Sequence, residues 1–276
     1  MKTWFITGIS RGLGLALAKA ALAEGDAVIG TVRSGTPDLE AAPGKLTVIT
    51  VDVADGAAAE AAVKQAFAQA GKIDVIVNNA GYGLLGATEK ATDDQLTHIF
   101  AVDVFAPFRI IRTALPYLRA QGSGHIVNIT SVAGRAPAAG YSLYAAVKFA
   151  LEGLSASLAQ ELAPFGIKVT AVAPGAFRTD FLSAHSIRKS DADGAYAESI
   201  GRITAAFDAN DGKQIGDPER GARAIIAAVD ADTPPVHLLL GSDALRRARE
   251  KLDTVIEEID RWEDVTRSTD FPAAVA

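Results

Sequence analysis

The sequence predicts an α/β protein in which a doubly wound parallel sheet of seven strands carries helices on both faces. Short β-branched, apolar segments recur along the chain, and alanine-rich helical segments separate most of them. Hydrophobic residues make up 49% and charged residues 22%, the balance of a globular protein. We find no repeat, low-complexity tract or linker, so one domain is expected over residues 1–276.

Seven segments have the composition of buried parallel strands, which are apolar on both faces. They are TWFIT (3–7), AVIGTV (27–32), LTVITV (46–51), DVIVNNA (74–80), HIVNIT (125–130), IKVTAVA (167–173) and VHLLL (236–240). The helical segments after the first and third strands stop at Gly25 and Gly71, because glycine commonly ends a helix. Another helix is expected over 141–163, where apolar residues recur at helical spacing.

Composition excludes several classes of function. The net charge of −6 gives no basic surface for nucleic acid, and the absence of cysteine removes disulfides, thiolate nucleophiles and zinc–sulfur sites. The histidines are too scattered for a metal site and are expected at the surface or in satisfied interior positions; they are His98, His125, His185 and His237. Without a signal-peptide core or a long apolar run, a cytoplasmic protein that contacts no membrane is expected.

The segment TGISRGLG (7–14) follows the first strand and opens the first helix. Glycines at 8, 12 and 14 let the backbone turn tightly, approach a pyrophosphate and begin a helix whose free N–H groups face the anion. A glycine loop in this place is typical of a dinucleotide site in a Rossmann-type fold. The loop residues predicted to bind the cofactor are Gly8, Ser10, Arg11, Gly12, Leu13 and Gly14.

The end of the second strand bears on the choice of cofactor. The acidic residue that usually binds the ribose of NAD is absent there, and Arg33 stands in its place. A guanidinium suits a 2′-phosphate, and Arg11 adds a second positive charge, so NADP(H) is favoured over NAD(H). The alternatives are that Arg33 is a solvated loop residue, and that the chain prefers NAD.

The segment GYSLYAAVKFA (140–150) contains two tyrosines and one lysine. On a helix Tyr144 and Lys148 are four residues apart, about 6 Å along the axis, whereas Tyr141 is seven residues from Lys148. Tyr144 is therefore the predicted partner of the lysine. A nearby ammonium favours the phenolate and lowers the tyrosine pKa, which suits proton exchange with an alcohol or carbonyl. The alternative is an incidental pair on a solvated helix face.

Taken together, these motifs resemble the short-chain dehydrogenase/reductase family over residues 3 to about 240. The resemblance rests on TGISRGLG, NNAG (78–81), a serine after the fifth strand, YAAVK (144–148) and PG (174–175) in this order. It implies that Tyr144 is the general acid and base, that Lys148 lowers its pKa and holds the nicotinamide ribose, and that Ser131 positions the substrate oxygen. It also implies transfer of the pro-S hydride.

The same resemblance implies further cofactor contacts. They are Asp52 with Val53 near the adenine, Asn79, Ala80 and Gly81 as a wall beside the ribose, and Pro174, Gly175, Phe177 and Thr179 as a strip beside the nicotinamide. The segments VIGTVRS and HLLLGSDALRRAREKL are similar to the hydroxysteroid-dehydrogenase-like branch of the family. That branch does not fix the substrate, since members of one fold act on many ligands.

The sequence departs from the family's pattern at Asp103, where the family commonly has an asparagine. That asparagine supports, chiefly through its main-chain carbonyl, a water that relays protons to the lysine. Pro107 lies four residues later and has no N–H to bond that carbonyl, so the carbonyl should stay available to water. We therefore count Asp103 with the catalytic residues and expect Asp103→Asn to change turnover by less than tenfold.

The long segment over about 176–217 follows the sixth strand and is expected to cover the substrate site. Its aromatic residues line an apolar pocket or pack within the segment, and the sequence does not decide between the two; they are Phe177, Phe181, Tyr196 and Phe207. The expected function is an NADP(H)-dependent interconversion of a ketone or aldehyde and its alcohol on an apolar, aromatic or steroid-like molecule. The alternative is an NADP-binding redox sensor without turnover, which would not need Ser131, Tyr144 and Lys148.

The C-terminal segment predicts an amphipathic helix over about 242–263, capped by Ser242. Its apolar residues are expected to dock inward; they are Leu245, Leu252, Val255, Ile256 and Ile259. The family often assembles through the helices equivalent to 93–120 and 141–163, so the resemblance implies a homodimer or homotetramer.

Overall fold

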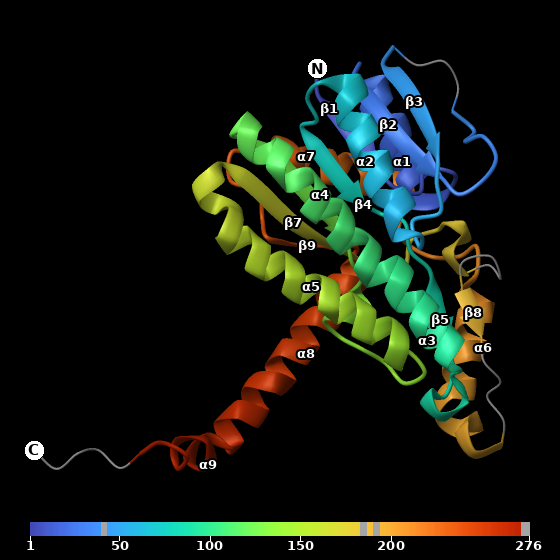
Figure 1. Ribbon diagram of the computed structural model, residues 1–276. Coiled ribbons are helices and arrows are strands. Elements are labelled where there is room, and N and C mark those ends of the chain that lie inside the picture. Colours follow the sequence, from blue (N-terminus) through green and yellow to red (C-terminus); the bar gives the residue numbers. More distant parts are fainter. Residues whose placement is uncertain (40–42, 183–186, 190–193, 272–276) are drawn as a thin grey trace, which may run out of the picture.

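The computed structural model describes residues 1–39, 43–182, 187–189 and 194–271. Figure 1 shows its central sheet, which is parallel throughout and has the order β3-β2-β1-β4-β6-β7-β9. The strands are β1 (Thr3–Ile6), β2 (Ala27–Val32), β3 (Lys45–Thr50), β4 (Val75–Asn78), β6 (Gly124–Ile129), β7 (Ile167–Pro174) and β9 (His237–Leu240). Each strand lies on one of the seven predicted segments, and the predicted fold class is confirmed.

Helices cover both faces of the sheet, as expected from strands that are apolar on both faces. They are α1 (Gly12–Ala23), α2 (Gly56–Ala70), α3 (Asp93–Phe100), α4 (Ala106–Gln121), α5 (Ser142–Leu162), α6 (Arg202–Asn210), α7 (Pro218–Asp230), α8 (Ser242–Arg261) and α9 (Glu263–Arg267). Side chains of α1 and α7 pack in one core cluster, and those of α2, α4 and α5 pack in the other. Neighbouring strand residues alternate between the two clusters: Trp4 lies in the first and Phe5 in the second.

The sheet order places the site. β1 and β4 are neighbours, but the chain leaves β1 toward α1 on one face and leaves β4 toward α4 on the other face (Figure 1). Such a point, where the connections diverge, leaves a crevice beyond the carboxyl ends of the strands. The buried Asn78 amide of β4 donates to the Asn128 side chain of β6 at 2.8 Å, which keeps the ends of these two strands side by side.

The segment 176–217 contains more regular structure than the sequence indicated. A short strand, β8 (Ile187–Lys189), pairs with β5 (Gly83–Leu85) in a separate two-stranded sheet, and α6 follows. Three-residue strands are too short to give a clear alternating pattern, so the sequence did not reveal them. Residues 183–186, with His185, and 190–193 lie outside the described residues.

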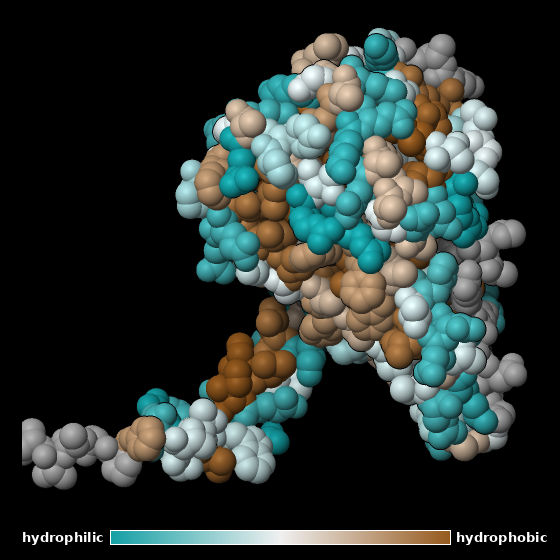
Figure 2. Space-filling model, in the orientation of Figure 1, coloured by the Kyte–Doolittle hydropathy of each residue, from teal (hydrophilic) through white to brown (hydrophobic). Residues whose placement is uncertain are grey.

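Two expectations about the C-terminal helix are wrong. Ser242 is the first residue of α8 and makes no side-chain cap, because Gly241 occupies the cap position. The helix also projects from the body (Figure 1), and its hydrophobic side chains are visible along the projection (Figure 2). The exposed fractions are 41% for Leu245, 61% for Leu252, 54% for Ile256 and 61% for Ile259, whereas Val255 is half-buried. An amphipathic pattern predicts an apolar helix face but not what covers that face.

Within the part of the chain that the structure describes, no helix combines the length and the apolar character that crossing a membrane requires.

His125 is buried, with Nδ1 lacking a hydrogen-bond partner among the described residues, and it carries a pH-dependent part of the stability. Its Nε2 lies 2.9 Å from Thr170 Oγ1, whose own proton goes to the Pro235 carbonyl, so the imidazole donates to the hydroxyl. Burial, followed by the charge of Lys168, lowers the pKa of His125 from 6.5 to about 4. The folded protein therefore binds this proton less readily than the unfolded chain does.

We expect His125 to destabilise the fold as pH falls. Between about pH 6.5 and pH 4 the unfolded histidine is protonated and the folded one is not, so linkage predicts a loss of about 3 kcal/mol in the free energy of unfolding. Urea unfolding at pH 7.0 and pH 4.5 measures this loss. His125→Gln keeps an N–H donor for Thr170 and should show a smaller loss. Equal losses in both proteins would show that His125 is not the titrating group.

Candidate active site

A cavity of about 640 Å³ lies beyond the carboxyl ends of the strands. It is lined by residues that follow β1, β2, β3, β4, β6 and β7 and by residues of α5. The predicted site residues among them are Gly8, Ser10, Arg11, Gly12, Leu13, Arg33, Asp52, Val53, Asn79, Ala80, Gly81, Ser131, Tyr144, Lys148, Pro174, Gly175, Phe177 and Thr179. The fold therefore brings together segments that are far apart in the sequence. Gly14 and Asp103 are the predicted residues that do not line the cavity.

The loop after β1 has the geometry of an anion site. Gly8 and Gly12 have φ values of +74° and +60°, in the left-handed region that favours glycine. Arg11 precedes α1, but its side chain does not cap the helix, so the N–H groups of the first turn remain directed at the cavity. A pyrophosphate fits this cradle, because backbone N–H groups and a helix N-terminus both favour negative charge.

Gly14 does not line the cavity, and the structure gives it a packing role. A Cβ at this position would lie 2.4 Å from the Gly8 carbonyl oxygen and 2.3 Å from the Asn79 side-chain nitrogen. The Asn79 amide nitrogen donates to the carbonyls of Thr7 and Gly8, at 2.9 and 3.0 Å. The absent side chain of Gly14 thus lets Asn79 fasten the glycine loop to the end of β4.

Arg33 lies at the end of β2, beside the loop after β1, because β1 and β2 are paired neighbours. Arg11 and Arg33 both line the cavity and are exposed, and neither forms an ion pair with another described residue. Two guanidinium groups at this edge can accept a phosphate group between them. Asp52, also in the lining, accepts a hydrogen bond from the Ala54 N–H at 3.0 Å.

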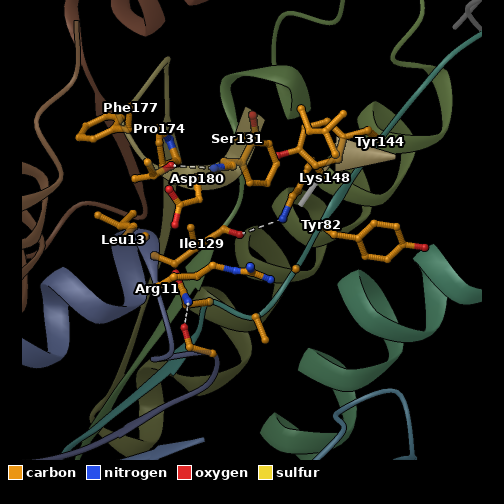
Figure 3. Close-up of a pocket in the computed structure, with 18 of the residues that line it drawn as sticks. Arg11, Leu13, Tyr82, Ile129, Ser131, Tyr144, Lys148, Pro174, Phe177 and Asp180 are labelled. Carbon is orange, nitrogen blue, oxygen red and sulfur yellow. Dashed lines mark hydrogen bonds between the residues drawn. The ribbon is translucent and has the colours of Figure 1, made fainter. Parts of the chain in front are cut away.

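Tyr144 and Lys148 lie on successive turns of α5, as the spacing predicted, and both are buried. The ammonium of Lys148 is 5.5 Å from the centre of the Tyr144 ring and donates to the Ile129 carbonyl at 3.2 Å (Figure 3). The Ser131 side chain lowers the pKa of the Tyr144 hydroxyl, and its Oγ accepts from the Ala133 N–H at 3.1 Å. The three side chains meet at one wall of the cavity.

Lys148 lowers the pKa of Tyr144, as the sequence predicted, but the net shift has the opposite direction. Burial raises the pKa of Tyr144, and it outweighs the lowering by Lys148 and by the hydrogen bond from Ser131. Asp103 raises the same pKa further. The lysine acts in the predicted direction, but the low dielectric around the ring has the larger effect.

Asp103 contacts Lys148 through its carboxylate, which the sequence did not predict. Asp103 lies in a π-helical turn, Ala101–Phe105, that precedes α4, and Pro107 has no N–H to restore the α-helical bond to residue 103. Its Oδ2 is 3.1 Å from Lys148 Nζ, and its Oδ1 accepts from the Tyr82 N–H at 3.2 Å. A Cβ on Gly81 would lie 2.8 Å from Oδ2, so glycine there permits the approach.

This ion pair is shielded from solvent. Asp103 is 1% exposed and Lys148 is 5% exposed. Burial lowers the pKa of Lys148, but the negative charges of Asp103 and Tyr144 outweigh it and raise that pKa. Burial raises the pKa of Asp103, against the opposing effect of Lys148. Asp103 therefore places a negative group beside Lys148, in addition to the neighbouring Tyr144.

A buried network holds the loop that carries Ser131. Glu152 lies on α5 one turn beyond Lys148; it accepts from the Thr130 hydroxyl at 2.5 Å and pairs with Arg135 at 3.1 Å. Gly134 packs against the Lys148 backbone, where a Cβ would lie within 2.9 Å. Glu152 and Arg135 therefore fix Ser131 relative to Tyr144. A glutamate in an amphipathic helix gives no sequence signal of such a contact.

The cavity lining also contains residues that the sequence did not assign to the site. Tyr82 and His98 lie ring to ring at 5.4 Å, and Tyr141 and Arg247 also line the cavity. Of the aromatic residues in the segment 176–217, Phe177, Phe181 and Phe207 line the cavity and Tyr196 does not. The sequence did not indicate Arg247 as a site residue, because the charged residues of α8 have the pattern of a solvated helix face.

Comparison with known proteins identifies close relatives. Residues 2–189 match the family model described as short chain dehydrogenase. The chain is 35% identical over 269 residues to "Oxidoreductase BOA17" of Botryotinia fuckeliana, covering 96% of this chain and 98% of that protein. A short-chain dehydrogenase from Streptomyces avermitilis superposes with a TM-score of 0.89 at 41% identity, covering 98% of this chain and 100% of that one. The structure "ElxO with NADP Bound" superposes with a TM-score of 0.73 at 25% identity, covering 89% and 99%.

Proposed function

The chain belongs to the short-chain dehydrogenase family of oxidoreductases, and we propose that it interconverts a ketone or aldehyde and its alcohol with NADP(H). The observation that carries this proposal is the meeting of Tyr144, Lys148 and Ser131 at the wall of the cavity. A redox sensor has no need of a buried proton-transfer group, so this arrangement favours an enzyme.

In the proposed reduction, Ser131 orients the substrate oxygen and the Tyr144 hydroxyl donates its proton to that oxygen. Lys148 stabilises the phenolate that forms, since its ammonium is held beside the ring by Ile129 and Asp103. When bound, NADPH supplies the hydride to the carbonyl carbon. Oxidation of the alcohol runs through the same groups in reverse, with Tyr144 accepting the proton.

The residues that would hold the cofactor are the loop after β1, the wall over Asn79 to Gly81 and the strip over Pro174 to Thr179. Arg11 and Arg33 support a preference for NADP(H), because their positive charges match a 2′-phosphate. NADP bound to the related ElxO structure adds support. The alternative, an enzyme that prefers NAD, gives Arg33 no part in cofactor binding.

Arg33→Gln is expected to raise the KM for NADPH by about tenfold, the loss of roughly one charge-assisted contact, while the KM for NADH stays within about twofold. Steady-state kinetics with each cofactor measure both values. The NADH measurement controls for general damage to the site. An unchanged KM for NADPH would identify Arg33 as a solvated loop residue and favour the NAD alternative.

The proposed activity is tested by following NADPH absorbance with aryl ketones, steroid ketones, aldehydes and small sugars, and then NADP⁺ with the matching alcohols. Turnover of one carbonyl class supports the reductase. Tight binding of NADPH without turnover in either direction would favour the redox sensor. We expect apolar, aromatic or steroid-like substrates to be favoured, because Phe181 lies beside the Tyr144 ring at 5.9 Å.

The proposed assembly is a homodimer or homotetramer formed through α4 and α5. Exposed aromatic side chains on these helices support it: Phe108 and Tyr117 on α4 and Phe149 on α5 are between 39% and 47% exposed. Sedimentation velocity of the purified chain would distinguish these states from a monomer.

A further inference from the structure

A second cavity, of about 360 Å³, adjoins the active-site cavity. It lies between the loop 136–138, α6 and residues 247–254 in the middle of α8. Tyr141, Phe207 and Arg247 line both cavities. These three side chains therefore stand at the boundary between the two cavities.

A row of aromatic rings leads from the proposed reaction centre to this second cavity. The Tyr144 ring lies 6.1 Å from the Tyr141 ring, and the Tyr141 ring lies 5.4 Å from the Phe207 ring in an edge-to-face contact. Phe181 extends the row on the other side of Tyr144. Such a row offers apolar contact over a length greater than that of a small ketone.

Positive charge stands at the end of this row. Arg247 donates one N–H to the Ala136 carbonyl at 2.6 Å, which holds the guanidinium in place and leaves its other donors for a ligand. Lys251 lies one helical turn further along α8 and lines the second cavity. Neither side chain forms an ion pair with another described residue.

Two carboxylates lie near these cations. Glu250 lines the second cavity and pairs with Arg246 at 3.2 Å. Asp243 lines the active-site cavity and accepts from the Ala176 N–H at 2.8 Å through Oδ2, whereas its buried Oδ1 has no hydrogen-bond partner among the described residues. The other cations of the active-site cavity are committed elsewhere in our proposal, Arg11 and Arg33 to the cofactor and Lys148 to Asp103. Arg247 and Lys251 are thus the cations at the substrate end.

We propose that the substrate is an elongated carbonyl compound whose apolar part lies along the aromatic row and whose anionic end binds Arg247 and Lys251. This inference rests on the proposed function, since it places the carbonyl at Tyr144. It assigns to α8 a direct part in substrate selection. A carboxylate suits the guanidinium fork of Arg247, so the test uses a carboxylate.

The first measurement compares 10-oxoundecanoate with its methyl ester in the NADPH-dependent reaction. The wild-type protein should have a KM about tenfold lower for the acid than for the ester, the value of one charge-assisted contact. Arg247→Gln should bring the two KM values together, and Lys251→Gln, which removes no contact between described residues, should narrow the difference. Arg249→Gln is the matched control, because Arg249 lies on α8 but lines neither cavity.

The second measurement separates the two proposals. Calorimetric titration of decanoate into the protein saturated with NADPH requires no turnover, and Arg247→Gln should weaken that binding about tenfold while Arg249→Gln leaves it unchanged. If decanoate binding depends on Arg247 but no ketone is turned over, the proposed function is wrong and the anion site is supported. Equal KM values for acid and ester, with decanoate binding equal in wild type and Arg247→Gln, would overturn the anion site and leave the reductase intact.

Discussion

Tyr144→Phe is expected to lower kcat/KM for ketone reduction by about 10²- to 10⁴-fold, the usual contribution of a positioned general acid. The substitution removes the hydroxyl whose pKa Ser131 lowers and leaves the buried ring in its place between Tyr141 and Phe181. Initial rates with saturating NADPH measure the effect. Titration of NADPH into the variant should show retained binding, because the ring and Lys148 remain.

Tyr141→Phe is the matched comparison for this prediction. The two rings lie 6.1 Å apart in the same cavity, but the sequence spacing and the structure both place Lys148 beside Tyr144. Burial raises the pKa of Tyr141, and the opposing effect of Arg247 is smaller. We expect Tyr141→Phe to lose less than tenfold. Residual activity of Tyr144→Phe above about 1%, or a greater loss in Tyr141→Phe, would remove Tyr144 from the role of essential acid.

The sheet was predictable because the signal for each buried parallel strand lies within one short segment of the sequence. Buried parallel strands need apolar residues on both faces, and each of the seven segments has them. The motifs at the strand ends were predictable for a related reason: parallel strands bring their carboxyl ends to one edge, so Gly8, Asn79 and Ser131 had to meet there.

The parts that the sequence did not reveal depend on contacts between distant segments. The carboxylate of Asp103 meets Lys148 only because a π-helical turn rotates it inward and Gly81 leaves room. Arg247 enters the site because α8 starts beside the cavity, although its sequence has the pattern of a solvated helix. Amphipathic periodicity predicts which residues share a helix face, but tertiary packing decides what that face contacts.

Asp103→Ala is expected to reduce the free energy of unfolding by about 3 kcal/mol. It removes the carboxylate from a buried ion pair and leaves the Lys148 ammonium with only the Ile129 carbonyl as a described partner. It also leaves the Tyr82 N–H without its acceptor. Urea unfolding at neutral pH measures the loss. A loss below about 1 kcal/mol would mean that the pair adds little to the fold.

Asp103→Asn separates charge from shape. Asparagine keeps an oxygen for the Tyr82 N–H, so Asp103→Asn should destabilise the fold less than Asp103→Ala. The turnover of Asp103→Asn, measured at the optimum pH of the variant, should stay within tenfold of wild type. The carboxylate raises the pKa of Tyr144, so its removal should lower that pKa. Alcohol oxidation needs the phenolate and rises with pH as Tyr144 loses its proton; the rise should therefore move to lower pH in the variant. A profile of kcat/KM against pH that does not move would restrict Asp103 to a structural role, whereas a change in turnover above tenfold would give the carboxylate its own part in the chemistry.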